Sequence, residues 1–148
     1  MSLLVGTKNV GVQSVLSRGL VDLGSVYRKV CRKDSCGVKA FDTTNTGVTL
    51  QHSGIYHVTA IITFTAPTAG NVIFQLAENG TAIPGAIATE TITTATTEVK
   101  TTALDYFVLV DKGCVLGVMQ TIFKTLSIIN AGVGATISNV VFNVVKEA

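Results

Sequence analysis

The sequence is poor in the residues that build most catalytic and metal sites. Its 148 residues include no tryptophan, two histidines and three cysteines, and only 14% are charged. His52 and His57 are five residues apart and have no suitably spaced third metal ligand. A glycine-rich phosphate loop and a Gly-x-Ser-x-Gly nucleophile motif are also missing. We therefore predict that the chain is not an enzyme, has no catalytic or metal-binding residues and needs no cofactor.

Long apolar runs and a secretory signal are lacking as well. Hydrophobic residues make up 47% of the chain, but threonines interrupt them, and no run reaches the roughly 18 residues of a membrane-spanning helix. Residues 1–8 have neither the basic start nor the long apolar stretch of a signal peptide. We expect no membrane partner, and we expect the chain to stay in the cytoplasm where it is made until it is released.

The cysteines do not form a disulfide framework. Cys31, Cys36 and Cys114 are an odd number in a chain without a signal, and a single Cys-x4-Cys pair is poor zinc spacing. We predict free thiols.

Positive charge is unevenly distributed. Between Lys39 and Lys100 there is no lysine or arginine, whereas residues 1–39 hold seven basic residues and two acidic ones, a net charge of +5. Glycines interrupt the apolar clusters of residues 1–25, which predicts an extended or irregular arm. The basic residues from Arg28 to Lys33 fit either phosphate binding or a charge-protected edge strand. The edge strand is favoured because no aromatic residues alternate with the charges, so nucleic acid is not an expected partner.

The clearest positive feature is a period-2 pattern over residues 54–66. Tyr56, Val58, Ala60, Ile62 and Phe64 would share one face, and the opposite face is mostly threonine. This predicts a long strand that buries one face in a core.

The rest of the chain reads as further short strands. Asn79-Gly80 is the strongest hairpin signal, because a type I′ turn needs positive φ at both central positions. About eight to ten antiparallel strands without a long amphipathic helix predict an all-β fold, a sandwich or jelly roll.

Three stretches carry a resemblance to a known family. Ser53–Val58, Phe74–Gly85 and Leu126–Gly132 resemble the jelly-roll head domains of the C1q and tumour-necrosis-factor type, in particular the bacterial and bacteriophage versions on spore-surface filaments, phage fibres and capsid decorations. The resemblance covers Val38–Ala148 and implies two parts: an N-terminal basic attachment arm (1–37) and a jelly-roll domain (38–148).

This resemblance also implies a threefold trimer around an apolar axis. The middle of the chain has few charged residues, which agrees with burial in subunit contacts. Threonines that face water would be an alternative source of surface polarity. The aromatic candidates for the trimer interface are Tyr56, Phe74, Tyr106, Phe123 and Phe142.

The function that follows is structural. We expect a trimeric capsid decoration or head-fibre protein of a bacteriophage, on the virion surface, assembled in the host cytoplasm and bound through its arm to the major capsid protein or another virion protein. The alternatives are the receptor-binding head of a tail fibre, with a ligand on the host surface, and a bacterial surface C1q-like module. The capsid-attachment candidates are Leu3, Leu4, Lys8, Val15, Leu16, Arg18, Arg28, Lys29, Arg32 and Lys33.

Overall fold

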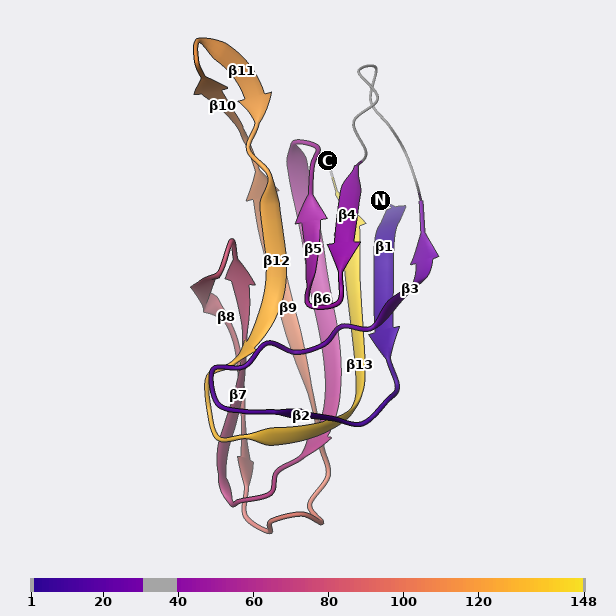
Figure 1. Ribbon diagram of the computed structural model, residues 1–148, viewed down its shortest axis with the longest axis vertical. Coiled ribbons are helices and arrows are strands. Elements are labelled where there is room, and N and C mark those ends of the chain that lie inside the picture. Colours follow the sequence, from indigo (N-terminus) through magenta and orange to yellow (C-terminus); the bar gives the residue numbers. More distant parts are fainter. Residues whose placement is uncertain (1, 31–39, 148) are drawn as a thin grey trace.

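The computed structural model describes residues 2–30 and 40–147, which contain thirteen β-strands and no helix (Figure 1). The strands are β1 (Ser2–Asn9), β2 (Gln13–Val15), β3 (Ser25–Lys29), β4 (Phe41–Thr44), β5 (Gly47–Leu50), β6 (Gly54–Thr65), β7 (Gly70–Glu78), β8 (Thr81–Ile92), β9 (Lys100–Val110), β10 (Lys112–Val115), β11 (Val118–Thr121), β12 (Lys124–Asn130) and β13 (Ala135–Lys146). No helix suited to crossing a membrane occurs in the described ranges.

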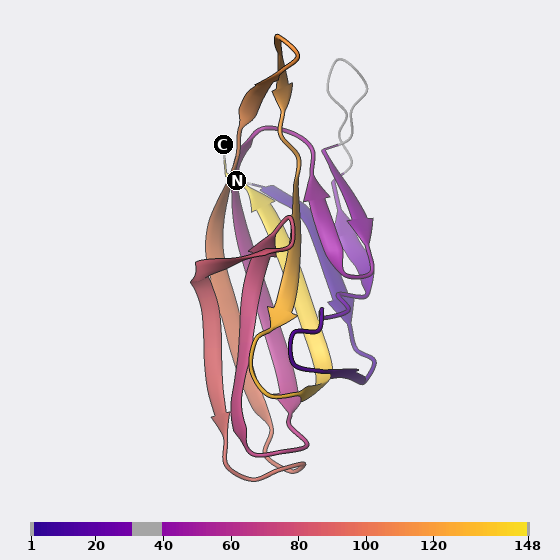
Figure 2. The ribbon, with the colours of Figure 1, turned by 60° about the vertical axis from the view of Figure 1, so that its left-hand side comes forward.

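Two antiparallel sheets face each other (Figures 1 and 2). One has the order β3-β1-β13-β6-β9, with β2 also pairing with β13, and the other has the order β4-β5-β12-β7-β8. The chain passes from one sheet to the other between β3 and β4, β5 and β6, β6 and β7, β8 and β9, and β12 and β13, and also between β9 and β12 through the β10–β11 hairpin. Such crossing connections between two antiparallel sheets are typical of a jelly roll, so the predicted all-β jelly-roll sandwich is confirmed.

The core lies between the sheets and is built by the predicted alternation. Tyr56, Val58, Ala60, Ile62 and Phe64 of β6 are all buried. Phe64 meets Phe74 of β7 edge to face, with ring centroids 5.2 Å apart. The T-shaped geometry places the positive edge of one ring against the negative face of the other, which adds to the gain from burial.

The N-terminal region does not form a separate arm. β1 lies inside its sheet between β3 and β13, and its register with β13 runs from Ser2↔Lys146 to Asn9↔Val140. Val5, Val21 and Leu23 are completely buried in the core. The described residues of the predicted arm are therefore part of the sandwich, and this corrects the expected boundary at residue 37.

Backbone bonds fix the irregular part of the same region. The amide of Val21 donates to the carbonyl of Ile128 (2.9 Å), and the amide of Leu23 donates to the carbonyl of Asn45 (2.7 Å). The buried side chain of Asn130 donates to the carbonyl of Val15 at 3.2 Å. Glycines interrupt the apolar pattern of this region, so the sequence gives no sign of regular structure here. Hydrogen bonds to distant strands fix its backbone instead.

Candidate functional site: the outer face of one sheet

The outer face of strands β6 and β9 carries apolar side chains that the described residues leave about half exposed. In the register of these strands, Ile55 lies opposite Leu109 and Ile61 opposite Ala103. Successive residues of a strand point to opposite faces, so these side chains point away from the buried Tyr56 and Ile62. In the two rows between them, His57 lies opposite Phe107 and Thr59 lies opposite Asp105.

Four large apolar side chains on this face are about half exposed. The exposed fractions are 43% for Ile55, 49% for Ile61, 58% for Phe107 and 55% for Leu109. We call these four residues the outer apolar patch. On the neighbouring strand β13, the partly buried Val141 and Val145 lie opposite Ile61 and His57. Ile55, Phe107 and Leu109 lie in neighbouring rows, whereas the polar pair Thr59 and Asp105 separates them from Ile61. Exposed apolar side chains gathered on one sheet face are typical of an interaction site, whereas single ones are not.

The ionisable side chains beside the outer apolar patch contact one another. The His57 ring stacks on Phe107, with centroids 4.5 Å apart and planes inclined by 12°. Its Nε2 lies 2.5 Å from an Asp105 carboxylate oxygen, and its Nδ1 lies 3.8 Å from a Glu147 carboxylate oxygen. Because they approach different ring nitrogens, the two carboxylates do not converge on one point. This arrangement orients His57 and lowers the cost of covering it.

One side of the sheet is closed by the chain itself. Tyr27 of β3 lies over Gly6 of β1, where an added Cβ would come 2.7 Å from the tyrosine ring. The Tyr27 hydroxyl donates to the Asn143 side-chain oxygen (2.7 Å), and the Lys8 ammonium lies 5.5 Å from the ring centroid. The open area is therefore confined to the β13, β6 and β9 side.

The structure corrects three of the five aromatic trimer candidates. Tyr56, Phe74 and Phe142 are completely buried within the single chain, so they belong to its own core and are not available to a subunit interface. Tyr106 is partly buried against that core at the β9 edge, and Phe123 is 45% exposed after the β10–β11 hairpin. These two remain candidates.

Sequence reasoning missed the outer apolar patch. Ile61 was visible as an apolar residue on the threonine face of the 54–66 strand, but one residue does not mark a patch. Phe107 and Leu109 join it only through the pairing of β6 with β9, 48 residues apart at the His57–Asp105 bond. That register is set by the whole fold.

The attachment candidates are divided by burial. Leu4 (6% exposed) and Val15 (4%) are core residues, which corrects their assignment. The side chain of Leu3 and the residues Arg32 and Lys33 lie outside the described residues. Those that remain exposed are Lys8, Leu16, Arg18, Arg28 and Lys29. Val10 (71%) and Val12 (76%) are also exposed between β1 and β2.

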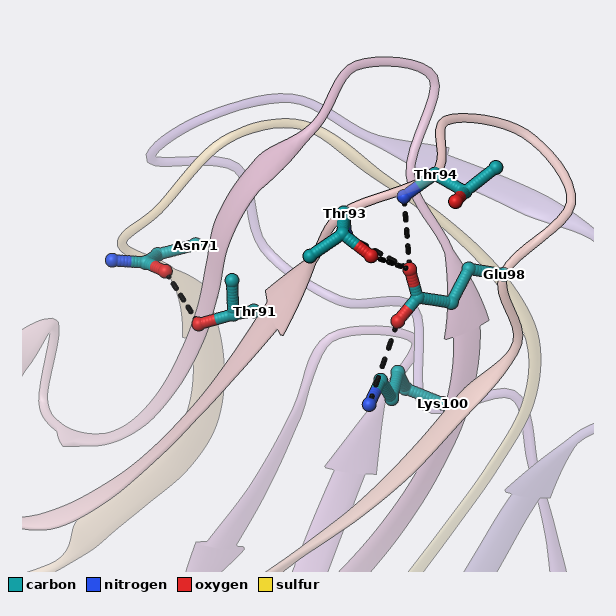
Figure 3. Close-up of polar contacts among 6 residues, drawn as sticks. All are labelled: Asn71, Thr91, Thr93, Thr94, Glu98 and Lys100. Atoms are coloured by element: carbon teal, nitrogen blue, oxygen red, sulfur yellow. Dashed lines mark hydrogen bonds and ion pairs between the residues drawn. The ribbon is translucent and has the colours of Figure 1, made fainter.

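The loop between β8 and β9 shows how the threonine-rich segment is ordered (Figure 3). One oxygen of Glu98 accepts bonds from the amides of Thr93 and Thr94 and from the Thr93 hydroxyl, at 2.8–2.9 Å. Its other oxygen lies 3.5 Å from the Lys100 ammonium. These backbone bonds lower the pKa of Glu98 to about 2. Thr91 donates to Asn71 nearby, and the loop serves to close the end of the sandwich.

No group of three histidine, cysteine, aspartate or glutamate side chains gathers as a metal site would require, within residues 2–30 and 40–147. The absence of catalytic residues stays a prediction.

Comparisons with known proteins return structures only. No protein-family model matches the sequence, and no curated protein matches it. Solved structures similar to the chain include the Eiger TNF from S. frugiperda, with 12% identity and a TM-score of 0.49, covering 100% of this chain and 96% of the other. The PRD1 vertex protein P5 has 16% identity and a TM-score of 0.45, covering 96% of each chain. The CBM35 from Cellvibrio japonicus Abf62 has 16% identity and a TM-score of 0.38, covering 93% of this chain and 99% of that chain. Likenesses of this size do not indicate what the chain binds.

Proposed function

We propose that the chain is a structural protein of a bacteriophage particle: a homotrimer on the virion surface, in the manner of a capsid decoration or head fibre. The observation that carries the trimer is the outer apolar patch, which the described residues leave about half exposed on one side of a jelly roll. The assignment to a virion rests on the resemblance of three sequence stretches to bacteriophage jelly-roll heads of the C1q and tumour-necrosis-factor type.

A second copy of the chain is the occupant that fits the patch. The patch lies at the β9 edge of its sheet, where Tyr106 and the exposed Ile87 of β8 form the rim of the sandwich. In a threefold ring the contact is heterologous, so the face of one subunit meets the edge of the next and the ring closes after three copies. Stable interfaces bury about 800 Å² on each partner, so the trimer interface must extend beyond the four side chains of the outer apolar patch.

We assign the attachment surface to the exposed residues of the N-terminal region, because this region does not form a separate arm. Val10, Val12 and Leu16 are 71–76% exposed, and Arg18 lies beside them in the chain. Apolar side chains next to basic ones suit attachment to another virion protein, if the outer surface of that protein is acidic. Three copies on one trimer add avidity to a weak single contact.

The test is the location of the protein. Particles purified by density gradient from a lysate of the source organism should contain the chain, and immunogold labelling should decorate the head. Label at the tail tip would instead support the receptor-binding alternative, and particles free of the protein would refute the virion assignment. An added Phe107→Asp variant should fail to incorporate. Val99→Asp, an equally exposed apolar position (62%) outside the patch, is the matched control and should incorporate normally.

A further inference from the structure

The β10–β11 hairpin stands apart from the rest of the fold. Its strands form a two-stranded sheet of their own, and both ribbon views place it beyond the end of the sandwich (Figures 1 and 2). An isolated two-stranded hairpin is marginally stable in water. A partner that covers the projecting hairpin would therefore stabilise it more than it would stabilise a strand inside the sandwich.

The turn of this hairpin is built from an unfavourable residue. The φ angles of Leu116 (51°) and Gly117 (78°) are within 3° of those of Asn79 (50°) and Gly80 (81°) at the β7–β8 turn. Asparagine adopts positive φ readily, whereas leucine does so rarely. Leu116 is also 98% exposed. The side chain thus contributes neither turn propensity nor burial within its own chain.

Other apolar side chains surround the turn. Val118 is 57% exposed and Met119 is 64% exposed, and as neighbours on one strand they point to opposite faces of the hairpin. Ile122 (48%) and Phe123 (45%) follow at its base. From residue 112 to residue 123 the only charged residue is Lys112. A partner must therefore offer an apolar surface to the tip and to both faces.

We propose that the β10–β11 hairpin is an intersubunit clasp that packs against a neighbouring copy of the chain. This inference rests on the proposed trimer. The hairpin begins three residues after Leu109 of the outer apolar patch, with the exposed Asp111 between them, so both features lie at the same end of β9. A lipid surface is the less suitable occupant, because the hairpin has one basic residue, whereas electrostatic binding to anionic membranes uses a cluster of them.

The turn supplies a variant that separates binding from folding. Leu116→Asn installs the residue of the β7–β8 turn, so the hairpin itself should be kept or improved. The trimer dissociation constant, measured by sedimentation of the full chain over a dilution series, should nevertheless rise at least tenfold. Val99→Asn, which changes an exposed apolar residue in the β8–β9 loop, is the matched control and should leave it unchanged. An unaltered dissociation constant in Leu116→Asn, with a trimeric parent, overturns the clasp alone. A monomeric parent overturns both the clasp and the trimer.

A fluorescent reporter identifies the occupant. The chain has no tryptophan, so Leu116→Trp places a single indole at the tip. Its emission should be blue-shifted in the trimer and should move to longer wavelength as dilution dissociates the subunits. Vesicles of phosphatidylcholine and phosphatidylglycerol should not change it. An emission maximum that does not change with protein concentration but shifts when vesicles are added would show that lipid, and not a second copy, covers the hairpin.

Discussion

The two faces of strand β6 differ in what completes them. On the inner face Tyr56, Ile62 and Phe64 are closed in by the second sheet, and no large side chain there is left in water. On the outer face Ile55 and Ile61 are about half exposed beside Phe107 and Leu109 of β9. The chain buries one face of this strand completely and leaves the large side chains of the other about half exposed. The difference explains why a 47% hydrophobic sequence forms one sandwich and still has an apolar surface.

Removing residues 1–37 should have the largest effect, because it deletes part of the inner face. The deletion takes β1 out of the middle of its sheet and leaves gaps where Val5, Val21 and Leu23 pack. We expect the remaining chain to lose cooperative unfolding and near-UV circular dichroism. A truncated protein with a dispersed amide NMR spectrum would show instead that residues 38–148 fold alone.

The same contrast can be tested with one phenylalanine on each face. Phe142→Ala empties a completely buried site and should lower the free energy of unfolding by about 3–5 kcal/mol. Phe107→Ala removes a side chain that is 58% exposed and should cost the monomer about 1 kcal/mol or less. Urea unfolding at concentrations below subunit association measures both. Equal losses would mean that the outer face is part of the core.

These residues also show how far the sequence could be interpreted. The 54–66 alternation and the Asn79-Gly80 turn were sufficient to predict the long strand and the β7–β8 hairpin, because these signals are local. The jelly roll was predicted from the number of short strands without a long amphipathic helix and from the family resemblance. The β1 strand was missed because Gly6 interrupts its pattern, while its hydrogen-bond partner β13 lies at the other end of the chain. Aromatic residue type alone could not separate Phe142 of the core from Phe107 of the patch, since only strand pairing decides which face is covered.

Tyr56 gives the inner face a dependence on alkaline pH. Burial raises its pKa from 10.0 to about 12, and its hydroxyl donates to the His52 carbonyl at 2.6 Å. The protonated phenol is favoured in the fold, so this stabilisation is complete below pH 10 and is lost as the pH rises toward 12. Tyr56→Phe should cost about 1 kcal/mol at pH 7. Its unfolding free energy should then fall less steeply than that of the parent from pH 10 to pH 12, and parallel curves would contradict this account.

The smallest expected effect lies in the β8–β9 loop, away from both faces. Because backbone bonds lower the pKa of Glu98 to about 2, the ordered loop should persist above pH 4.5 and loosen as the pH falls toward 2. Carboxyl carbon NMR should give Glu98 a midpoint near 2, and Glu98→Gln should speed exchange of the Thr93 and Thr94 amide protons. A midpoint near 4.5 would mean that these bonds do not form in solution.

The most direct test of the central claim is the mass of the native assembly, measured by light scattering at micromolar concentration for the parent and for Phe107→Asp. A charge buried in an apolar interface without a partner is strongly unfavourable. We predict a parent mass of three 15.4 kDa chains and a folded monomer for the variant. A parent that stays a monodisperse monomer, or a variant that remains a trimer, would contradict the assignment of the outer apolar patch to a subunit interface.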